Sequence, residues 1–347
     1  MKKSILSIVI LSIIITLSGC ISTKPQYKSK KNKELIIYSA YEEEQVLEYI
    51  SGFKEEYPDI EVNLIIDSHG IISAKVLSER DNPQADLVWG LSAINIIDLE
   101  GKGLLSPYKS KNIDEVKEQF KDDNEVPYWS GLDATETAFV VNYKELEELG
   151  IPIPKSFEDL IKAEYKGLIT MPNPASSGTG YFTVSAIIQM LGEEKGFEYM
   201  NKLHENIGVY THSGSKPSKL AGSGEYPIGI SFGYRGIMQM ANGEPVKVVF
   251  PKEGSGWDLE SIALVNKVNV KEEAKLFYDW ALSKGAMNSY AKNTPITCIP
   301  TEADIPEGYN DDPVGQLIEN DLNWASKNRE RILKTWESKY GAKSESK

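Results

Sequence analysis

Short apolar runs alternate with helical patterns along the first third of the chain. Runs typical of strands lie at 34–40, 60–66 and 85–90. Apolar residues at helical spacing follow at about 43–53, 71–79 and 92–100. This alternation predicts an α/β fold with a parallel sheet covered by helices on both faces. Ligands of such sheets bind beyond the carboxyl ends of the strands, where the loops begin at Ser39, Ser68 and Trp89.

The remainder of the chain predicts a second unit of the same class. Strands are expected at 139–142, 168–172, 226–232, 246–250 and 261–265, and helices at 181–191, 195–205, 271–284 and 325–340. We predict lobe 1 at 34–138 plus 255–300, lobe 2 at 139–254, and a C-terminal helical segment at 301–347. The chain is expected to cross between the lobes near 133–142 and again near 251–262.

The first twenty residues have the pattern of an export signal. Lys2 and Lys3 precede an apolar run at 5–17, which is too short to span a bilayer comfortably. The run ends in Leu17-Ser18-Gly19-Cys20, which resembles the lipobox of a bacterial lipoprotein. The resemblance implies a signal peptide at 1–19 and a diacylated Cys20, followed by a polar tether at 20–33. The alternative is an uncleaved membrane helix with a chance cysteine.

The charge balance argues against nucleic acid or bulk anionic lipid as a partner. The chain carries 38 Lys and Arg against 51 Asp and Glu, for a formal net charge of −13. Loss of Lys2 and Lys3 with the signal peptide would make the charge −15. An acidic surface repels polyanions. It still permits a local anion site built from backbone amides and one arginine.

One loop has the composition of an anion site. It reads Ser176-Ser177-Gly178-Thr179-Gly180 and lies between a predicted strand and a predicted helix. Glycines allow successive N–H groups to face one point, and the helix dipole favours an anion there. The alternative is an ordinary helix N-cap, which Ser and Thr also supply. Arg235, next to Tyr234, could add a bidentate contact to a phosphoryl group, or form a surface ion pair.

Other candidate ligand-binding residues lie at predicted strand ends or in loops facing the cleft. Trp89 and Trp257 each adjoin a glycine and could wall the cleft, or serve only in packing. Carboxylates that could hold an ammonium group, or simply be solvated, are Glu42, Asp133, Glu253 and Asp258. The set is completed by Ser39, Ala40, Ser92 and Ser231.

Catalytic motifs are incomplete. Residues 229–233 match G-x-S-x-G around Ser231, but all three histidines, His69, His204 and His212, precede that serine. An α/β-hydrolase needs its histidine after the nucleophile. The sequence contains no H-E-x-x-H, Walker A or dinucleotide fingerprint. Cys298 has no partner once Cys20 is lipidated, and we expect it to be a buried thiol. We expect neither enzymatic activity nor a cofactor.

Blocks along nearly the whole mature chain resemble, in order, the type II solute-binding proteins of ABC importers. The blocks are 37–40, 85–90, 173–181, 230–236, 251–258 and 328–336. The resemblance implies a two-lobed, periplasmic-binding-protein-like α/β fold with the ligand cleft between the lobes. It also implies an extracytoplasmic, lipid-anchored monomer. Such a protein binds a small anionic ligand and delivers it to ABC permease and ATPase subunits.

The resemblance is greatest to the subgroup that binds ferric iron, 2-aminoethylphosphonate and sugar phosphates. A phosphonate or phosphate ester is the favoured ligand. Iron-binding members use adjacent tyrosines, whereas the equivalent strand end of this chain offers only Tyr234, which Glu42 could supplement, and the sequence has no Tyr-Tyr pair. His69 departs from the small hydroxyl residue common in phosphonate-binding members. Other small solutes, and a structural lipoprotein that binds nothing, remain open.

Overall fold

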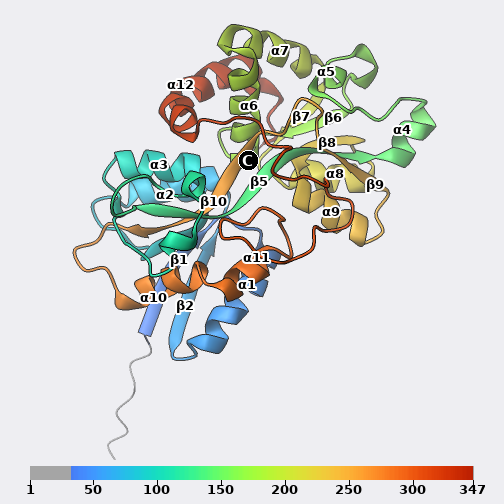
Figure 1. The fold of residues 1–347 in the computed structure, drawn as a ribbon. Coiled ribbons are helices and arrows are strands. Elements are labelled where there is room, and N and C mark those ends of the chain that lie inside the picture. Colours follow the sequence, from blue (N-terminus) through green and yellow to red (C-terminus); the bar gives the residue numbers. More distant parts are fainter. Residues whose placement is uncertain (1–32, 347) are drawn as a thin grey trace, which may run out of the picture. The chain divides into compact units, whose positions relative to one another are not determined.

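The computed structural model describes residues 33–346 and begins with a parallel sheet. Its strands are β1 (Lys33–Ser39), β2 (Ile60–Ile66) and β3 (Leu87–Ser92), in the order β2-β1-β3 (Figure 1). The predicted signal peptide, Cys20 and the tether up to residue 32 lie outside the described residues. Parallel pairing here agrees with the strand–helix alternation of the sequence.

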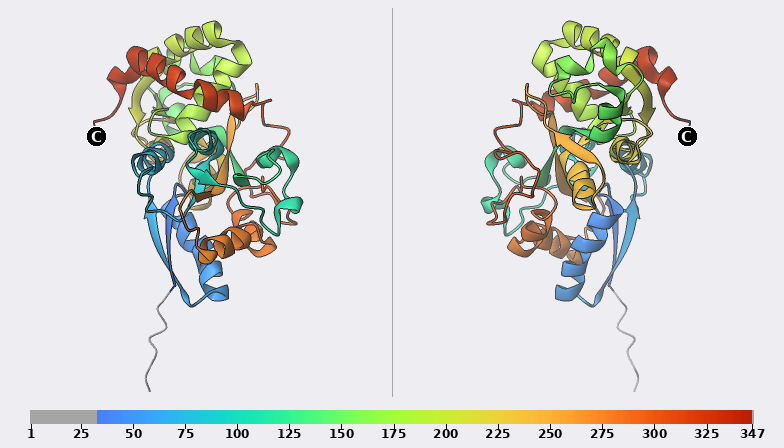
Figure 2. Two further views of the ribbon diagram at one scale, coloured as in Figure 1. Left: turned by 90° about the vertical axis from the view of Figure 1, so that its left-hand side faces the viewer. Right: turned by 90° about the vertical axis from the view of Figure 1, so that its right-hand side faces the viewer.

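Helices cover this sheet on both sides. They are α1 (Glu43–Glu56), α2 (His69–Ser78), α3 (Ala93–Gly101), α10 (Glu272–Ala281) and α11 (Lys284–Tyr290). Helix α1 packs against α11, and α2 packs against α3. Figures 1 and 2 show these two pairs on opposite sides of the sheet. The chain moves from β1 to β2 in one direction along the sheet and from β2 to β3 in the other. Right-handed crossovers therefore place α1 and α2 on opposite faces.

A second group of parallel strands carries the middle of the chain. It contains β6 (Ile169–Pro172), β7 (Ile207–Thr211) and β8 (Ile228–Phe232). Parallel pairing joins β6 to both neighbours. The associated helices are α4 (Tyr143–Leu149), α5 (Phe157–Leu160), α6 (Gly178–Leu191), α7 (Glu193–Asn206), α8 (Lys216–Ser223) and α9 (Gly233–Ala241).

Two long strands join the parallel groups. They are β5 (Trp129–Asn142) and β10 (Trp257–Val265). Strand β10 pairs antiparallel with β3 and β5, and β5 pairs antiparallel with β8 and with β9 (Val246–Val249). The short β4 (Leu105–Ser106) pairs with β10. The sheet is therefore mixed, and β5 starts well before the strand expected at 139–142, because a polar stretch of it is also sheet-bonded.

Two separate cores define two lobes. The first core contains Trp89 and Phe277, and the second contains Phe139 and Met200, all of them fully buried. The predicted two-lobed α/β architecture is therefore observed, and the predicted crossing near 133–142 falls within β5. The precise lobe boundaries stay a prediction.

The C-terminal part of the chain contacts both lobes. Helix α12 (Leu322–Tyr340), the red helix of Figure 2, packs on α3. It also inserts the fully buried Trp336 into the second core. Before it, residues 301–321 form no helix or strand, apart from a bridge between Leu317 and Ser255. Short 3-10 turns complete the described chain: η1 (Ile113–Glu115), η2 (Glu118–Phe120), η3 (Ala163–Tyr165) and η4 (Gly341–Lys343).

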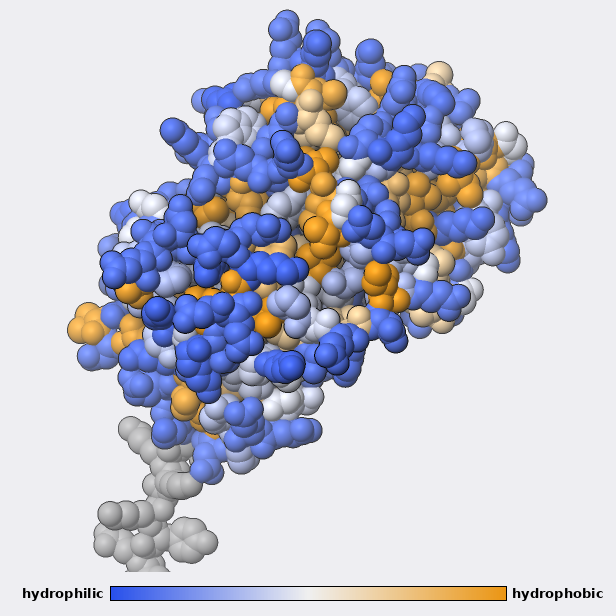
Figure 3. All heavy atoms as spheres, viewed as in Figure 1, coloured by the Kyte–Doolittle hydropathy of each residue, from blue (hydrophilic) through white to orange (hydrophobic). Residues whose placement is uncertain are grey.

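Hydrophilic residues cover most of the face shown in Figure 3, with smaller apolar areas between them. That distribution agrees with the strongly negative formal charge of −13. Within residues 33–346, no helix has both the length and the apolar character that crossing a membrane requires.

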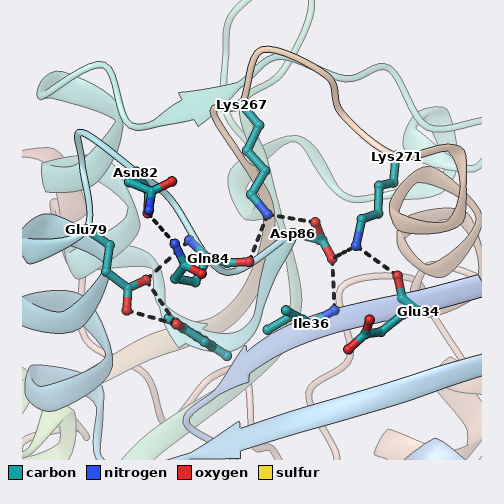
Figure 4. Close-up of polar contacts among 9 residues, drawn as sticks. Glu34, Ile36, Glu79, Asn82, Gln84, Asp86, Lys267 and Lys271 are labelled. Carbon is teal, nitrogen blue, oxygen red and sulfur yellow. Dashed lines mark hydrogen bonds and ion pairs between the residues drawn. The ribbon is translucent and has the colours of Figure 1, made fainter.

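A buried carboxylate ties the first sheet to the end of β10. Asp86 accepts 2.8 Å bonds from the ammonium groups of Lys267 and Lys271, and one of 2.9 Å from the N–H of Ile36 (Figure 4). Burial opposes the charge on Asp86, but these three donors more than offset it, so the pKa of Asp86 lies below its ordinary value. The side chain of Asp86 is 1% exposed. The cluster therefore joins three chain segments that are distant in sequence.

We expect Asp86→Ala to lower the free energy of unfolding by about 2–4 kcal/mol, because it leaves two ammonium groups and one amide without their acceptor. The loss should be seen in urea denaturation at pH 7. It should shrink as the pH falls below the ordinary carboxyl range, where the wild type also loses this charge. Glu272→Ala, which removes an exposed ion pair with Lys275, is the control, with a change within about 0.5 kcal/mol. Equal losses in both variants would contradict the assignment.

Candidate functional site

Five helix N-termini surround one cavity. The cavity has a volume of about 290 Å³ and is lined by residues of both lobes. Its wall includes first-turn or N-cap residues of α1, α2, α6, α8 and α9, each of which follows the carboxyl end of a strand. Each helix N-terminus carries a partial positive charge and free N–H groups. The fold thus directs five such termini at one site, as expected for the ends of strands in an α/β sheet.

Neutral hydrogen-bond donors line one side of the cavity. Ser177 is the N-cap of α6, and Thr179 lies in its first turn. No described residue accepts a hydrogen bond from the N–H groups of Gly178 and Thr179. The loop after β7 approaches closely, since a Cβ on Gly214 would lie 2.5 Å from Oγ1 of Thr179. This side of the cavity can therefore surround an anion with amide and hydroxyl donors.

Lys219 is the lysine of the cavity wall. It belongs to α8 and is exposed at the rim. No described carboxylate lies within ion-pair distance of its ammonium group. Lys219 is therefore available to pair with an anion held at the N-terminus of α6.

Carboxyl groups also line the cavity. Asp133 accepts a 2.7 Å hydrogen bond from the hydroxyl of Tyr41, and Glu136 accepts one from the hydroxyl of Tyr309. Burial raises the pKa of Asp133 and of Glu136 to about 7. It also raises the pKa of Glu260 well above its ordinary value. One oxygen of Glu136 and one of Glu260, both shielded from solvent, have no hydrogen-bond partner among the described residues. A ligand with hydroxyl or ammonium groups would satisfy them.

Glycine is required where Tyr41 lies over β3. Gly90 has φ 71°, and a Cβ there would lie 2.2 Å from the Tyr41 ring. The ring also packs edge-on against Trp89 at 5.3 Å. Gly90 thus lets Tyr41 reach Asp133 across the floor of the cavity.

Comparison with known proteins shows which family the chain belongs to. The sequence family of bacterial extracellular solute-binding proteins matches residues 82–317. The chain belongs to that family. An uncharacterised protein of Haemophilus influenzae is 32% identical over 82% of this chain and 84% of its own length. A putative 2-aminoethylphosphonate-binding periplasmic protein of Salmonella typhimurium is 24% identical over 65% of this chain and 66% of its own length.

A solved structure supports the same assignment. The periplasmic binding protein AfuA from Actinobacillus pleuropneumoniae, with exogenous fructose-6-phosphate bound, superposes with a TM-score of 0.82. It is 31% identical, and the match covers 89% of this chain and 99% of AfuA. The predicted type II fold with a cleft between the lobes is confirmed. The protein is therefore a periplasmic solute-binding protein of an ABC transporter.

For this solute-binding protein, the structure brings six of the sequence-predicted residues to the cavity wall. They are Ala40, Glu42, Asp133, Ser177, Thr179 and Tyr234. Ala40 and Glu42 follow β1, and Tyr234 lies in the first turn of α9 rather than at a strand end, because α9 begins at Gly233.

Several predicted hydroxyl residues lie behind the wall. Ser39 is fully buried, and its hydroxyl accepts from the N–H of Tyr41 at 3.4 Å. Ser176 donates to the carbonyl of His212 at 2.7 Å, and Ser231 donates to that of Gly214 at 2.7 Å. Gly178 lies directly against the His69 ring. Each of these residues shapes the loops that carry the wall.

Other predicted residues have internal partners. Asp258 accepts from the hydroxyl of Ser92, and burial raises the pKa of Asp258 to about 7. Glu253 accepts from the N–H groups of Phe157 and Glu158, and so caps α5. These contacts satisfy polar groups that we predicted to bind a ligand.

The two tryptophans and the arginine also lie away from the wall. Trp89 is fully buried in the first core, and Trp257 donates to the carbonyl of Ile318 at 2.9 Å. Arg235 faces Glu44 at 3.9 Å across a separate hollow. A helical start at Gly233 directs the Arg235 side chain away from the cavity wall, since successive residues of a helix point in different directions.

The wall also contains residues that the sequence reasoning missed. Tyr41, Glu136, Glu260, Lys219 and Tyr309 are among them. Thr135 and Glu136 lie inside what became β5, and polar residues within a buried strand are the signal that could have identified them. Tyr309 comes from the segment without regular structure and had no such signal.

The residues named for an iron site do not form a carboxylate cluster. Tyr234 and Glu42 both line the cavity. Within residues 33–346, however, no group of three or more His, Cys, Asp or Glu is placed to hold a metal ion.

Glu136→Gln should raise stability above pH 7. The folded-state pKa of Glu136, about 7, exceeds the ordinary 4.5, so its contribution is fully present below pH 4.5 and is lost as the pH rises through 7. A neutral amide avoids that loss and still accepts from Tyr309. We expect a gain of up to about 3 kcal/mol at pH 8, and little difference at pH 4. Urea denaturation measures it.

The control for this change is Glu55→Gln, an exposed position of α1. Its stability should follow the wild type at both pH values. A Glu136→Gln variant no more stable than wild type at pH 8 would show that the carboxyl group is not held in an unfavourable environment.

Proposed function

We propose that this protein binds a small phosphate ester or phosphonate between its lobes and delivers it to an ABC permease. The observation that carries the proposal is the division of the cavity. Amide and hydroxyl donors at α6 line the same cavity as carboxyl groups with two unpartnered oxygens. A phosphorylated compound with hydroxyl groups, such as a sugar phosphate, matches both sides.

The donor side suits the phosphoryl group. Helix N-termini bind phosphate through free N–H groups and the helix dipole, without a full positive charge from the protein. Ser177 and Thr179 add hydroxyl donors, and Lys219 lies at the rim. This arrangement reconciles an anionic ligand with an acidic protein.

The carboxyl side suits the rest of the ligand. Carboxylates accept hydrogen bonds from sugar hydroxyls or from an ammonium group. Fructose-6-phosphate, bound by AfuA, supplies the first kind of donor, and 2-aminoethylphosphonate supplies the second. The greater identity to AfuA, 31% against 24%, favours a sugar phosphate.

Other functions find less support in the cavity. Ferric iron would have to rely on Tyr234 and Glu42, because no group of three or more His, Cys, Asp or Glu among residues 33–346 is placed to hold a metal ion. Hydrolysis would need a base at Ser231, whose hydroxyl instead donates to a backbone carbonyl. We propose a non-catalytic monomer whose lobes close on the ligand by hinge motion near 133–142 and 251–262.

The affinities for fructose-6-phosphate and for inorganic phosphate should distinguish the role of the donor residues from that of the carboxyl groups. Thr179→Val removes a donor to the phosphoryl group and should weaken the binding of both ligands about three- to tenfold. Glu260→Gln removes an acceptor for a sugar hydroxyl, so it should weaken the binding of fructose-6-phosphate and leave the binding of inorganic phosphate, which carries no sugar, within about twofold. Isothermal titration calorimetry measures both.

Arg80→Ala is the control, because Arg80 is exposed, pairs with Asp81 within the first lobe and does not line the cavity. It should bind both ligands as the wild type does. A tenfold loss in this variant, or an effect of Glu260→Gln on both ligands alike, would contradict the assignment of the two sides. Ferric citrate in the same series tests iron, since a tyrosinate complex would be coloured and Tyr234→Phe would remove the colour.

We also propose that Cys20 anchors the protein to the membrane through lipid. The basis is the signal pattern and the Leu17-Ser18-Gly19-Cys20 run. Cys20→Ala should abolish acylation and cleavage by lipoprotein signal peptidase, as seen by mass spectrometry and gel mobility. Cys298→Ala, at a buried free thiol, is the control and should be processed normally. A processed, membrane-bound Cys20→Ala protein would refute the anchor.

A further inference from the structure

His69 and Gly70 form a direct contact between the lobes beside the cavity. They begin α2 in the first lobe, and the N–H of Gly70 donates to the carbonyl of Ser176 in the second lobe at 3.2 Å. A Cβ on Gly70 would lie 2.5 Å from the carbonyl oxygen of Ala175. A Cβ on Gly178 would lie 2.7 Å from the His69 ring. Two glycines thus allow the lobes to touch here.

Hydrogen bonding fixes the tautomer of His69. Its Nδ1 lies 3.0 Å from the backbone nitrogen of Ser92, which can only donate. Nδ1 must therefore accept, and the proton of the neutral ring is on Nε2. Nε2 lies 3.6 Å from Glu260, on the cavity wall. The contact is therefore made by a neutral imidazole, and protonation would place a second N–H against the N–H of Ser92.

The surroundings of His69 do not support an imidazolium. Burial and the charge of Arg329, from α12, lower the pKa of His69 to about 4. The facing carboxyl, Glu260 of β10, has a pKa well above its ordinary value and so gives little compensating charge. The next carboxyl, Asp258, is held by the hydroxyl of Ser92. Gly178, which covers the ring from α6, has no titratable group.

We infer that His69 forms a proton-sensitive contact between the lobes. The contact holds the protein closed while the imidazole is neutral and is lost when the imidazole is protonated. Separation of the lobes removes Gly178 from the ring and opens it to water, where an imidazolium is tolerated. Acid therefore favours the open form. The inference rests on the proposed function only in that closure retains the ligand; the contact itself is made by residues of the protein alone.

The first test needs no ligand. The chain has three histidines, so NMR of histidine-labelled protein can follow each titration. His69 should titrate well below its ordinary 6.5, and Gly178→Ala, which forces the ring away, should move its midpoint toward 6.5. Gly101→Ala, with nothing within 4 Å of the added Cβ, should leave it unchanged. A His69 midpoint near 6.5 in the wild type, or one unmoved by Gly178→Ala, overturns the proposal.

The second test uses fructose-6-phosphate. With a closed-state pKa of about 4 against 6.5 when open, lowering the pH from 7.5 to 5.5 should weaken binding by up to about tenfold through this group alone, the full factor applying where the protein without ligand is open. His69→Asn keeps an acceptor for Ser92 without titrating, and its loss should be smaller than that of the wild type by the same factor. Comparing the two variants cancels the titration of the ligand's phosphate and of the other cavity groups.

His204→Asn is the control, because burial also lowers the pKa of His204 but its ring bonds Tyr210 in the second core. It should show the wild-type pH dependence. An equal pH dependence of binding in the wild type and in His69→Asn would overturn the proposal of a proton-sensitive contact. If fructose-6-phosphate fails to bind the wild type at pH 7.5, the proposed ligand is wrong. The NMR titration then tests the proposed role of His69 without a ligand.

Discussion

The long strand β5 is the constraint on which the site depends. It is the one described strand that pairs with β10 on the first lobe and with β8 and β9 on the second. Because it passes between two cores, its middle residues face neither core but the space between the lobes. Asp133 and Glu136 occupy that stretch. The same backbone therefore joins the lobes and carries the carboxyl wall of the cavity.

Burying those carboxyl groups is unfavourable for the folded protein and useful for binding. A shielded carboxyl oxygen without a partner costs free energy of about 1–3 kcal/mol. Glu136 and Glu260 each have one. The helix N-termini around the cavity offset part of this cost through their dipoles. A ligand that donates to both oxygens recovers it, so the free protein holds acceptors already oriented for the ligand.

The contact between the lobes has a related origin. Parallel strand ends place the N-termini of α2 and α6 on opposite sides of the cleft. Where two helix starts meet, backbone must approach backbone, and only glycine permits that at Gly70 and Gly178. His69 fills the remaining space as a neutral ring. The proposed ligand site and the proposed proton-sensitive contact thus share one group of residues.

Local pattern determined much of the fold. Apolar runs and helical spacing placed β1, β2 and β3 and the helices between them, because each signal is carried by neighbours in sequence. The Ser177–Thr179 loop was also identifiable, since helix starts and glycines have local signatures. Strand β5 was only partly recognised, because a strand whose polar residues face a cleft lacks the pattern of a buried strand.

The sequence by itself determined an acidic α/β protein without an intact catalytic motif, and it predicted an export signal and an anion-binding helix start. The tertiary structure alone decided which charges meet there. It brought Glu136, Glu260 and Tyr309 to the wall from distant segments, and it placed Arg235 and Trp257 elsewhere. The reason is that the direction of a side chain depends on where its helix or strand begins, and its partners depend on which segments pack together. Neither is encoded in residues adjacent in the chain.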